Sequence, residues 1–377
     1  MNKITSPDIM KINNRRRILE IIYTEKNIYR AQIAEMTNMS NQTITNLVKE
    51  LINEGMVEEV TLENKAPGRN PMALSIRYGR LCSIGVEISV ESINAGLYDA
   101  AGNELQKLSM TRDVDSNVLA ALKEVIGRLT DGAEDLKLLG IAISIEGIVD
   151  DRNGVVIKAK NLGLDGINIL SELEYLNIPV QIKNDVNLLA ETDYGRESTN
   201  SYMLIKLGGG IGAALVLNGS LLRSTNNAAG EFGHVRLYSV KNPKACKCGQ
   251  SGCLTTEASV RAIEERAVMK VEELAGLYKS GDSYAVSVME EIAGYISEPL
   301  TNIIEILDLD KVIFTGRLID CFGGGLTGMI GGNIRRKLNK WSSFKGIDVL
   351  SDYSITARCA QYVVNNFFLK WKDETYD

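Results

Sequence analysis

Histidine is almost absent from this sequence, with one in 377 residues, and long hydrophobic runs are missing altogether. No stretch of about 18 apolar residues occurs, so we expect neither a membrane span nor a membrane partner. The N-terminus, Met1 to Pro7, lacks the apolar core of a secretory signal peptide, which favours a cytoplasmic protein. Three of the six cysteines (Cys82, Cys321 and Cys359) are widely separated, and in a reducing compartment we expect inert core residues there.

Length and charge suggest a small head joined to a larger body. A chain of 377 residues, 45% hydrophobic and 24% charged, is long enough for two or three globular domains. Residues 1–80 carry 12 Lys and Arg against 9 Asp and Glu, whereas the remainder carries 30 against 39. A basic head on an acidic body fits a nucleic-acid-binding module. We predict one domain over residues 1–80 and a second over residues 81–377.

Three helical patterns occupy the first 55 residues. They cover Arg15 to Tyr23, Ala31 to Thr37, and a third helix from a Ser40 cap to about Glu54, which Gly55 can end. The third helix has an apolar stripe at the spacing of an amphipathic helix. Its members are Ile44, Leu47, Val48, Leu51 and Ile52.

The opposite face of the third helix is polar but contains no acid in its first turn. Gln42, Thr45, Asn46 and Lys49 recur at i, i+3, i+4 and i+7. Short amides and hydroxyls can read base edges in a major groove, and Lys49 can contact phosphate. A merely solvated face is usually rich in Glu and Lys. The residues of this helix that we expect to contact DNA are Ser40, Asn41, Gln42, Thr43, Thr45, Asn46 and Lys49.

A two-stranded hairpin follows the third helix. Val57 to Leu62 has strand character, and Met72, Leu74 and Ile76 alternate with small or polar residues. Three helices and a hairpin indicate a winged helix-turn-helix that binds DNA, with a protein-binding winged helix as the alternative. The three arginines that precede the first helix, Arg15, Arg16 and Arg17, are further candidates for phosphate contacts.

The single histidine lies close in sequence to the other three cysteines. Gly230-Glu231-Phe232-Gly233-His234 is followed by Cys246-Lys247-Cys248-Gly249-Gln250-Ser251-Gly252-Cys253. One imidazole and three thiolates complete a tetrahedral zinc site, and four protein ligands leave no position for a reactive water. We therefore predict a structural zinc ion, Zn(2+), bound by His234, Cys246, Cys248 and Cys253. Buried cysteines packed as small apolar residues are the alternative, which the intervening Lys, Gly and Ser disfavour.

These two motifs resemble the signature of the ROK family, which contains bacterial sugar kinases and sugar-responsive repressors. In that family the Glu and the His hold sugar hydroxyls, and the His also binds zinc. The resemblance implies a two-lobed actin-like domain over residues 81–377, with a sugar between the lobes. It also implies that Arg69, in a Gly-Arg-x-Pro-like wing loop, reaches the minor groove. The sugar-binding residues that it implies are Asn161, Asn184, Asp185, Glu231 and His234.

From Leu81 onward, strand patterns alternate with helical patterns, which is typical of an α/β fold. The strands that we expect cover 81–88, 94–99, 138–145, 179–183, 202–207 and 213–218. Long helical patterns cover 283–307, 325–340 and 354–370. Repetition of the two implied lobes is not visible at the level of residues.

The nucleotide side departs from the kinases that the chain resembles. Those kinases begin with Asp-x-Gly-Gly-Thr, whereas this chain has Glu87-Ile88-Ser89-Val90-Glu91, with no glycine and an acid where phosphate would lie. Gly316-Arg317 replaces a glycine pair on the adenosine side. Lys206 to Gly212 remains close to the second phosphate loop and can also be only a tight turn. We therefore expect no ATP binding.

The sugar side departs at one position. Asp185 matches the proton acceptor of the kinases, which in a repressor accepts a hydrogen bond from the sugar, although an Asn-Asp pair is also a common helix cap. Thr255 stands where the family has Glu after Gly-Cys-Leu. Either the effector differs, or it binds more weakly, or Glu257 substitutes from a shifted position.

Together these features predict a sugar-responsive transcriptional regulator, a repressor rather than an enzyme. Its expected partners are operator DNA, a sugar or sugar-phosphate effector, and further copies of itself in a homodimer or homotetramer. One alternative is a ROK sugar kinase that phosphorylates a hexose with ATP. Another is a DNA-binding protein whose cleft has lost its ligand.

Overall fold

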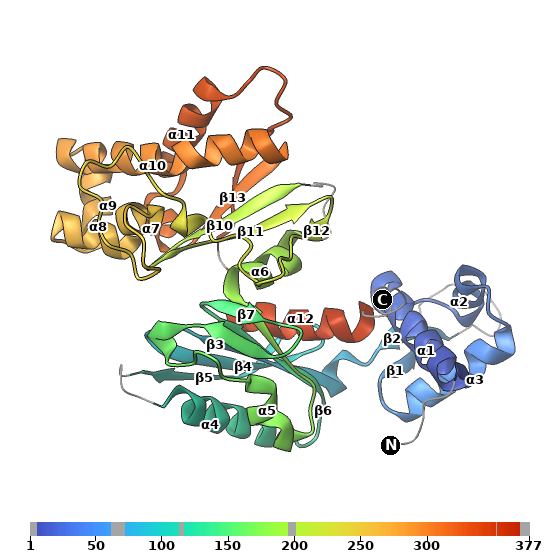
Figure 1. Ribbon diagram of the computed structural model, residues 1–377. Coiled ribbons are helices and arrows are strands. Elements are labelled where there is room, and N and C mark those ends of the chain that lie inside the picture. The colour runs from blue at the N-terminus through green and yellow to red at the C-terminus, as the bar shows by residue number, and fades with distance from the viewer. Residues whose placement is uncertain (1–5, 62–71, 113–116, 195–200, 352, 370–377) are drawn as a thin grey trace. The chain divides into compact units, whose positions relative to one another are not determined.

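The computed structural model describes residues 6–61, 72–112, 117–194, 201–351 and 353–369. The chain forms two compact units, one of Met1–Lys183 with Ser354–Asp377 and one of Asn184–Tyr353 (Figure 1). Within the described ranges, no helix has both the length and the apolar character of a membrane span. Helices and strands alternate in both units, so the predicted mixed α/β fold is confirmed.

The first unit begins with the predicted winged head, residues 6–80. It consists of α1 (Ser6–Glu25), α2 (Arg30–Thr37) and α3 (Asn41–Asn53), followed by the antiparallel strands β1 (Val57–Val60) and β2 (Ala73–Ile76). Apolar side chains of all three helices are buried in the core of this head. The turn between α2 and α3 is short because Asn38 adopts the left-handed conformation, which asparagine tolerates.

Helix α1 is longer than predicted. It begins at Ser6, so Arg15, Arg16 and Arg17 lie within the helix, and the prediction that they precede it is wrong. Pro7 provides the reason, because proline in a first helical turn loses no hydrogen bond. Met10 and Ile12 are exposed, so this half of the helix has no apolar stripe by which periodicity could find it.

The first unit also contains a five-stranded sheet of order β5-β4-β3-β6-β9. Strands β3, β4 and β5 form an antiparallel meander, and β6 runs parallel to β3. These strands are β3 (Leu81–Ile88), β4 (Ser92–Asp99), β5 (Glu104–Thr111), β6 (Lys137–Ile145) and β9 (Val180–Asn184). The smaller elements are η1 (Tyr78–Arg80), the hairpin β7 (Ile148–Asp150) and β8 (Val155–Lys158), η2 (Lys160–Leu162), and η3 (Glu174–Leu176).

Alternate residues of β3 face two different helical layers. Ile84 and Val86 join the core formed with α4 (Val118–Asp131) and α5 (Ile169–Leu173). Ser83 donates a hydrogen bond of 3.1 Å to the Ala360 carbonyl of α12 (Ile355–Leu369) on the other face. A Cβ at Gly85 would lie 1.8 Å from a carbonyl oxygen of α12, so only glycine lets this helix approach so closely.

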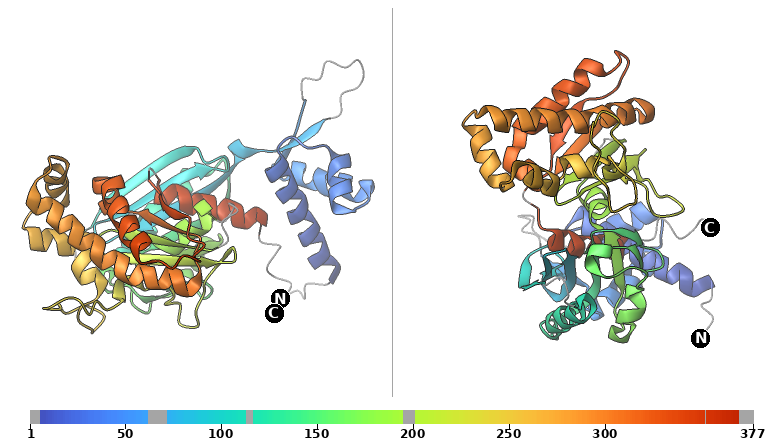
Figure 2. Two further views of the ribbon diagram at one scale, coloured as in Figure 1. Left: turned by 90° about the horizontal axis from the view of Figure 1, so that it is seen from above. Right: turned by 60° about the vertical axis from the view of Figure 1, so that its left-hand side comes forward.

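Helix α12 also contacts the winged head within the same unit. The rings of Phe368 and Tyr23 are stacked with centroids 4.9 Å apart, and Gln361 Nε2 donates to the Tyr23 hydroxyl at 3.1 Å. Figure 2 shows α12 in red beside α1 in dark blue from two directions. The head that we predicted as a separate domain therefore contacts the C-terminal helix through α1. The predicted border at residue 80 remains a prediction.

The second unit repeats this strand plan. Its sheet has the order β12-β11-β10-β13-β14, with β10, β11 and β12 antiparallel and β13 and β14 parallel to β10. The strands are β10 (Tyr202–Leu207), β11 (Ile211–Leu217), β12 (Ser220–Leu221), β13 (Lys311–Thr315) and β14 (Gly346–Val349). In both units a three-stranded meander is followed by a strand parallel to its first strand, and this is the internal repeat that the residues themselves did not reveal.

Two long helices cover one face of this second sheet. Ile205 and Leu207 of β10 pack into a core with Ile296 and Leu300 of α10 and with residues of α11. The short helix α6 contacts β10 and β11. Its Val186 side chain lies close to β11 because residue 212 is a glycine and has no side chain there. The helical elements are α6 (Asp185–Leu189), η4 (Ala190–Tyr194), η5 (Phe232–His234), α7 (Leu254–Ala258), α8 (Val260–Ala267), α9 (Val271–Lys279), α10 (Ser283–Leu307) and α11 (Arg317–Lys337).

Candidate functional site

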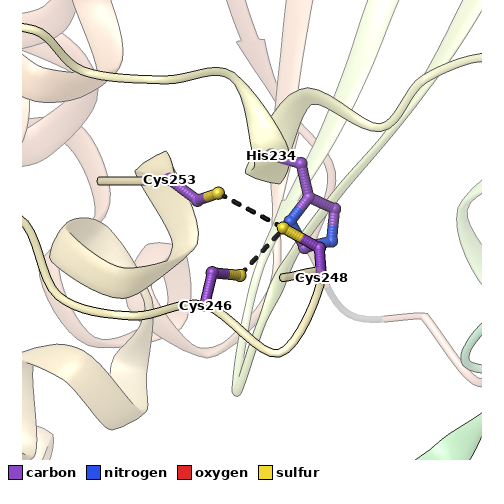
Figure 3. Close-up of side chains that lie close together, drawn as sticks. All are labelled: His234, Cys246, Cys248 and Cys253. Carbon is purple, nitrogen blue, oxygen red and sulfur yellow. Dashed lines mark hydrogen bonds between the residues drawn. The ribbon is translucent and has the colours of Figure 1, made fainter. Parts of the chain in front are cut away.

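The four predicted metal ligands lie together in the second unit. His234 ends η5, Cys246 and Cys248 lie on the following loop, and Cys253 directly precedes α7. Their ligand atoms all lie within 4.8 Å of one another. Cys246 Sγ is 3.5 Å from His234 Nδ1, and Cys248 Sγ is 3.6 Å from Cys253 Sγ (Figure 3). The sequence motif therefore corresponds to one spatial cluster.

A tight backbone turn presents the two loop cysteines. The Cys246 amide donates to the Gln250 carbonyl at 2.7 Å, and the Gly249 amide donates to the Cys246 carbonyl at 3.0 Å. Gly249 has a φ of 96°, which glycine adopts without strain. Cys253 is held from the other side because its neighbour Leu254 is fully buried in the core. Both ends of the loop are thus fixed to ordered backbone.

The donor set and its spacing fit zinc. With Zn–S bonds near 2.3 Å, the edge of a tetrahedral site is about 3.7 Å, close to the two separations observed. Cys253 is fully buried, and this burial raises the pKa of its thiol to about 12, so a nearby cation is needed to stabilise a thiolate. Three sulfurs and one imidazole are the soft ligands of closed structural sites. This cluster can therefore hold a metal ion.

His234 connects the metal cluster to Glu231. With Nδ1 directed at the sulfurs, Nε2 lies 3.5 Å from Glu231 Oε2. The two side chains are 38% and 44% exposed, so a solute can reach both. The turn that carries them packs tightly on β11, because a Cβ at Gly233 would lie 2.2 Å from the Ile211 carbonyl oxygen. Glu231 and His234 are therefore placed as a pair at a defined position on the sheet.

The Asn-Asp motif begins α6, on the same sheet. Asn184 is the N-cap, and its side chain accepts hydrogen bonds from the Val186 and Asn187 amides at 3.0 and 3.1 Å. Asp185 is not the cap. Its carboxylate instead accepts from Lys206 Nζ at 2.7 Å, and the Asp185 side chain is only 9% exposed. The Asn184 side chain thus caps the helix, whereas the Asp185 side chain pairs with a lysine of the sheet.

Lys206 is a residue whose role sequence reasoning missed. Its strand reads Tyr-Met-Leu-Ile-Lys-Leu, and a lysine in such a buried apolar strand requires a partner of opposite charge. That requirement was a usable signal, although it does not say which acid is the partner. The tertiary structure identifies the partner as Asp185.

Thr255 occupies the position at which the family has a glutamate after Gly-Cys-Leu. Thr255 Oγ1 faces the glycine turn between β10 and β11, where it would lie 3.8 Å from a Cβ at Gly210. Glu257 is buried, and its carboxylate accepts a hydrogen bond from the hydroxyl of the neighbouring Thr256 at 3.3 Å. The alternative that Glu257 substitutes for the missing acid from a shifted position remains a prediction.

The candidate phosphate segments are occupied by contacts of the chain itself. At the β3–β4 turn, Arg112 donates to the Ser89 and Val90 carbonyls at 2.7 and 3.2 Å, while Glu91 is exposed. In the second unit, Arg317 forms a forked ion pair with Glu272 at 2.7 and 2.9 Å. In the glycine turn, the Gly208 amide donates to the Gly210 carbonyl at 2.9 Å.

Asn161 belongs to the first unit, in contrast to the other predicted sugar-binding residues. It is exposed in η2 (Lys160–Leu162). Asn184, Asp185, Glu231 and His234 all belong to the second unit, where α6 and η5 both contact β11. The structure therefore brings four of the five predicted sugar-binding residues to one sheet.

The predicted DNA-reading face of α3 is exposed and ordered by short-range hydrogen bonds. The Ser40 side chain accepts from the Thr43 amide at 3.1 Å, which confirms the predicted cap. Gln42 Nε2 donates to Asn46 Oδ1 at 3.0 Å, so these amides hold each other in place on the surface. Asn41, Thr45 and Lys49 are also exposed on this face.

The arginines of α1 are less available than predicted. Arg15 forms ion pairs with Glu54 at 2.5 Å and Glu50 at 3.8 Å, which fasten α1 to α3. Arg17 donates to the Met36 carbonyl at 3.2 Å. Arg16 is half-buried in the same helix. The predicted wing residue Arg69 lies outside the described residues.

Known proteins are similar to this chain over most of its length, both in sequence and in structure. A "Putative xylose repressor" from Caldicellulosiruptor sp. (strain Rt8B.4) is 27% identical over 333 residues, covering 81% of this chain and 83% of that protein. The crystal structure of a ROK family transcriptional regulator, described as a homolog of the E. coli MLC protein, has a TM-score of 0.81 at 22% identity and covers 95% of this chain and 97% of its own. A ROK hexokinase from Thermus thermophilus has a TM-score of 0.62 at 25% identity and covers 74% and 97%.

Family profiles match the head and the body separately. Residues 13–58 match a family described as "Winged helix-turn-helix DNA-binding", a region that includes α2, α3 and the C-terminal part of α1. Residues 83–342 match the family described as "ROK family", a region that includes the metal cluster, Asp185 and the Glu231–His234 pair. Since this match covers well over half of the sequence, the chain belongs to the ROK family.

Proposed function

We propose that this protein is a sugar-responsive, DNA-binding transcriptional regulator, a repressor of genes for carbohydrate use. The observation that carries the proposal is one chain that combines an exposed, acid-free α3 face with an ordered Asp185–Glu231–His234 constellation. A relative that aligns over 81% of this chain is named "Putative xylose repressor". We propose a homodimer or homotetramer as the DNA-bound form, because paired heads match the symmetry of palindromic operators.

On DNA, we propose that α3 enters the major groove. Its amides at Gln42 and Asn46 would read base edges, and the exposed Lys49 would contact phosphate. Arg15 would contribute little to binding because it is already paired with two glutamates. The sugar would alter this binding through a difference in its affinity for two states of the protein.

For the effector, we propose a neutral sugar rather than a sugar phosphate. Asp185 and Lys206 neutralise each other, which leaves the Glu231 carboxylate as the unmatched charge among the candidate sugar ligands of the second unit. Three thiolates around a divalent ion add a further negative charge close by. A phosphate group would be repelled by these charges, whereas hydroxyls can donate to the carboxylates.

For the metal cluster, we propose a structural Zn(2+) held by His234, Cys246, Cys248 and Cys253. When bound, the ion would fix the His234 ring in one orientation through Nδ1 and leave Nε2 facing Glu231. The remaining protein groups would then bind sugar hydroxyls without any chemical change in the ligand. We assign no catalytic residue.

Kinase activity is the second candidate, since the family includes hexokinases such as the Thermus thermophilus protein. The exposed Glu91 at the β3–β4 turn disfavours phosphate there, and Arg112 occupies the carbonyls of the same turn. Incubation of the full-length protein with Mg-ATP and a panel of hexoses and pentoses tests this directly. We expect no sugar phosphate, and turnover above that of a heat-denatured control would refute the proposal.

The regulator proposal is tested with DNA fragments selected from the source genome by the purified protein. Fluorescence anisotropy on a selected fragment would be followed while D-xylose, D-glucose and N-acetyl-D-glucosamine are added in turn. We expect binding at moderate salt and release by at least one neutral sugar. Failure to select any fragment, or DNA binding that no sugar changes, would refute the corresponding part of the proposal.

A further inference from the structure

An ion pair lies beside the candidate sugar ligands, at the end of a strand that is otherwise apolar. Lys206 and Asp185 are joined at 2.7 Å, and their side chains are 19% and 9% exposed. On the same strand, Ile205 and Leu207 face the core formed with α10, so Lys206 faces the opposite side, toward α6. The arrangement is local to one unit of the protein.

Backbone packing fixes this pair. In the sheet, Lys206 lies opposite Gly212 of β11 and Thr315 of β13. Because residue 212 has no side chain, Val186 of α6 approaches to 3.0 Å from where a Cβ would stand. This close approach brings Asp185, the first residue of α6, within reach of the lysine. The carboxylate and the ammonium group are therefore held by the sheet and the helix rather than by a flexible loop.

Fold stability does not account for such a pair. Removing two charges from water costs free energy that their attraction often only balances, and an apolar pair of similar volume is commonly as stable. A pair that remains slightly exposed can instead act on a ligand. A sugar hydroxyl both donates and accepts, so it can donate to Asp185 and accept from Lys206 at the same time.

We propose that Lys206 is a specificity-determining residue of the sugar site, which binds one hydroxyl of a neutral sugar jointly with Asp185. This inference rests on the proposed function, because it assumes that Asp185 contacts the effector. It adds a charged donor to a site in which the carboxylates of Asp185 and Glu231 can only accept. A sugar whose hydroxyl is replaced by hydrogen at that position loses the contact with both members of the pair.

The test compares Lys206→Met with wild type by titration calorimetry. The probes are D-xylose, D-glucose and N-acetyl-D-glucosamine, followed by the monodeoxy analogues of whichever sugar binds. Loss of one hydrogen bond from a charged donor predicts about 10- to 100-fold weaker binding of the parent sugar. One monodeoxy analogue should bind the variant and the wild type equally, within about twofold, because it lacks the hydroxyl in question.

Lys311→Met is the matched control. Lys311 forms an ion pair of the same length with Asp348 in the same sheet, but it lies at the start of β13, opposite Tyr202 rather than Lys206. We expect its sugar affinity to equal that of wild type. Lys206→Arg replaces Lys206→Met in the test if the methionine variant does not fold. It keeps the positive charge but moves the hydrogen-bond donors. We expect the same loss of sugar affinity, again confined to one hydroxyl.

The outcomes separate the two proposals. If no sugar binds wild type, both the proposed function and this inference are wrong. If wild type binds and Lys206→Met binds every sugar as well as wild type does, only this inference is overturned. Equal weakening of all deoxy analogues would show a purely positioning effect on Asp185 and would likewise overturn it. The inference is supported if Lys206→Met binds the parent sugar more weakly than wild type does but binds one monodeoxy analogue equally well.

Discussion

Replacing Cys248 by serine should remove the metal and destabilise the loop that it closes. The ligand atoms lie within 4.8 Å of one another, and two of their separations are 3.5 and 3.6 Å, so the loss of one sulfur leaves an incomplete tetrahedron. We expect about one zinc ion per wild-type chain and a small fraction of that in Cys248→Ser, measured by atomic absorption after gel filtration.

The magnitude follows from the loop that the metal closes between His234 and Cys253. Treated as a cross-link of that length, closure restricts the unfolded chain by about 3 kcal/mol. For a unit of this size, each kcal/mol corresponds to about 2–4 °C, so the melting temperature should fall by an amount on the order of 10 °C. Differential scanning fluorimetry with and without a chelator measures this fall.

Cys321→Ser is the control, because this cysteine is half-buried and distant in sequence from the motif. It should keep both zinc and melting temperature. Glu231→Gln should also keep zinc but lose sugar-dependent release of DNA, because Glu231 faces His234 Nε2 and not the sulfurs. A wild-type protein isolated without metal, whose melting temperature is unaffected by added zinc or chelator, would falsify the reasoning.

Three further variants test the head and its docking. Lys49→Ala should lower the dependence of log affinity on log salt concentration by about 0.9, because one phosphate contact is lost; an unchanged slope would exclude that contact. Arg15 lowers the pKa of Glu54 by hydrogen bonding, so the pair stabilises the head above the ordinary carboxyl pKa, and this contribution is lost as pH falls through the lowered value. In urea denaturation, Arg15→Met should therefore cost less than about 1 kcal/mol at neutral pH and nothing at acidic pH, whereas an equal cost at both would contradict the ion pair. Gly85→Ala should destabilise by about 1–3 kcal/mol or more because its Cβ would meet a carbonyl of α12, while Gly127→Ala in α4, with open space around it, should be neutral or slightly stabilising.

The sequence by itself determined the features that depend on residues close together in the chain. The cap at Ser40 and the apolar stripe of α3 predicted that helix almost to its ends, because both signals act within a few turns. The spacing of His234 and the three cysteines predicted the cluster that the structure contains, because four soft donors so close in sequence are suited to one metal ion. Local periodicity failed at the start of α1, where the apolar side chains of Met10 and Ile12 are exposed.

The tertiary structure decided what depends on residues far apart in the chain. Only the packing of α6 on β11 shows that Asp185 faces Lys206, and only the position of α7 shows that Thr255 faces the glycine turn. The same holds for α12, which meets the head through Phe368 and Tyr23. The repeated strand plan of the two units is visible in their sheets alone. Its physical reason is that hydrogen bonding between strands fixes topology through the backbone, so two sheets can share a plan while their side chains differ.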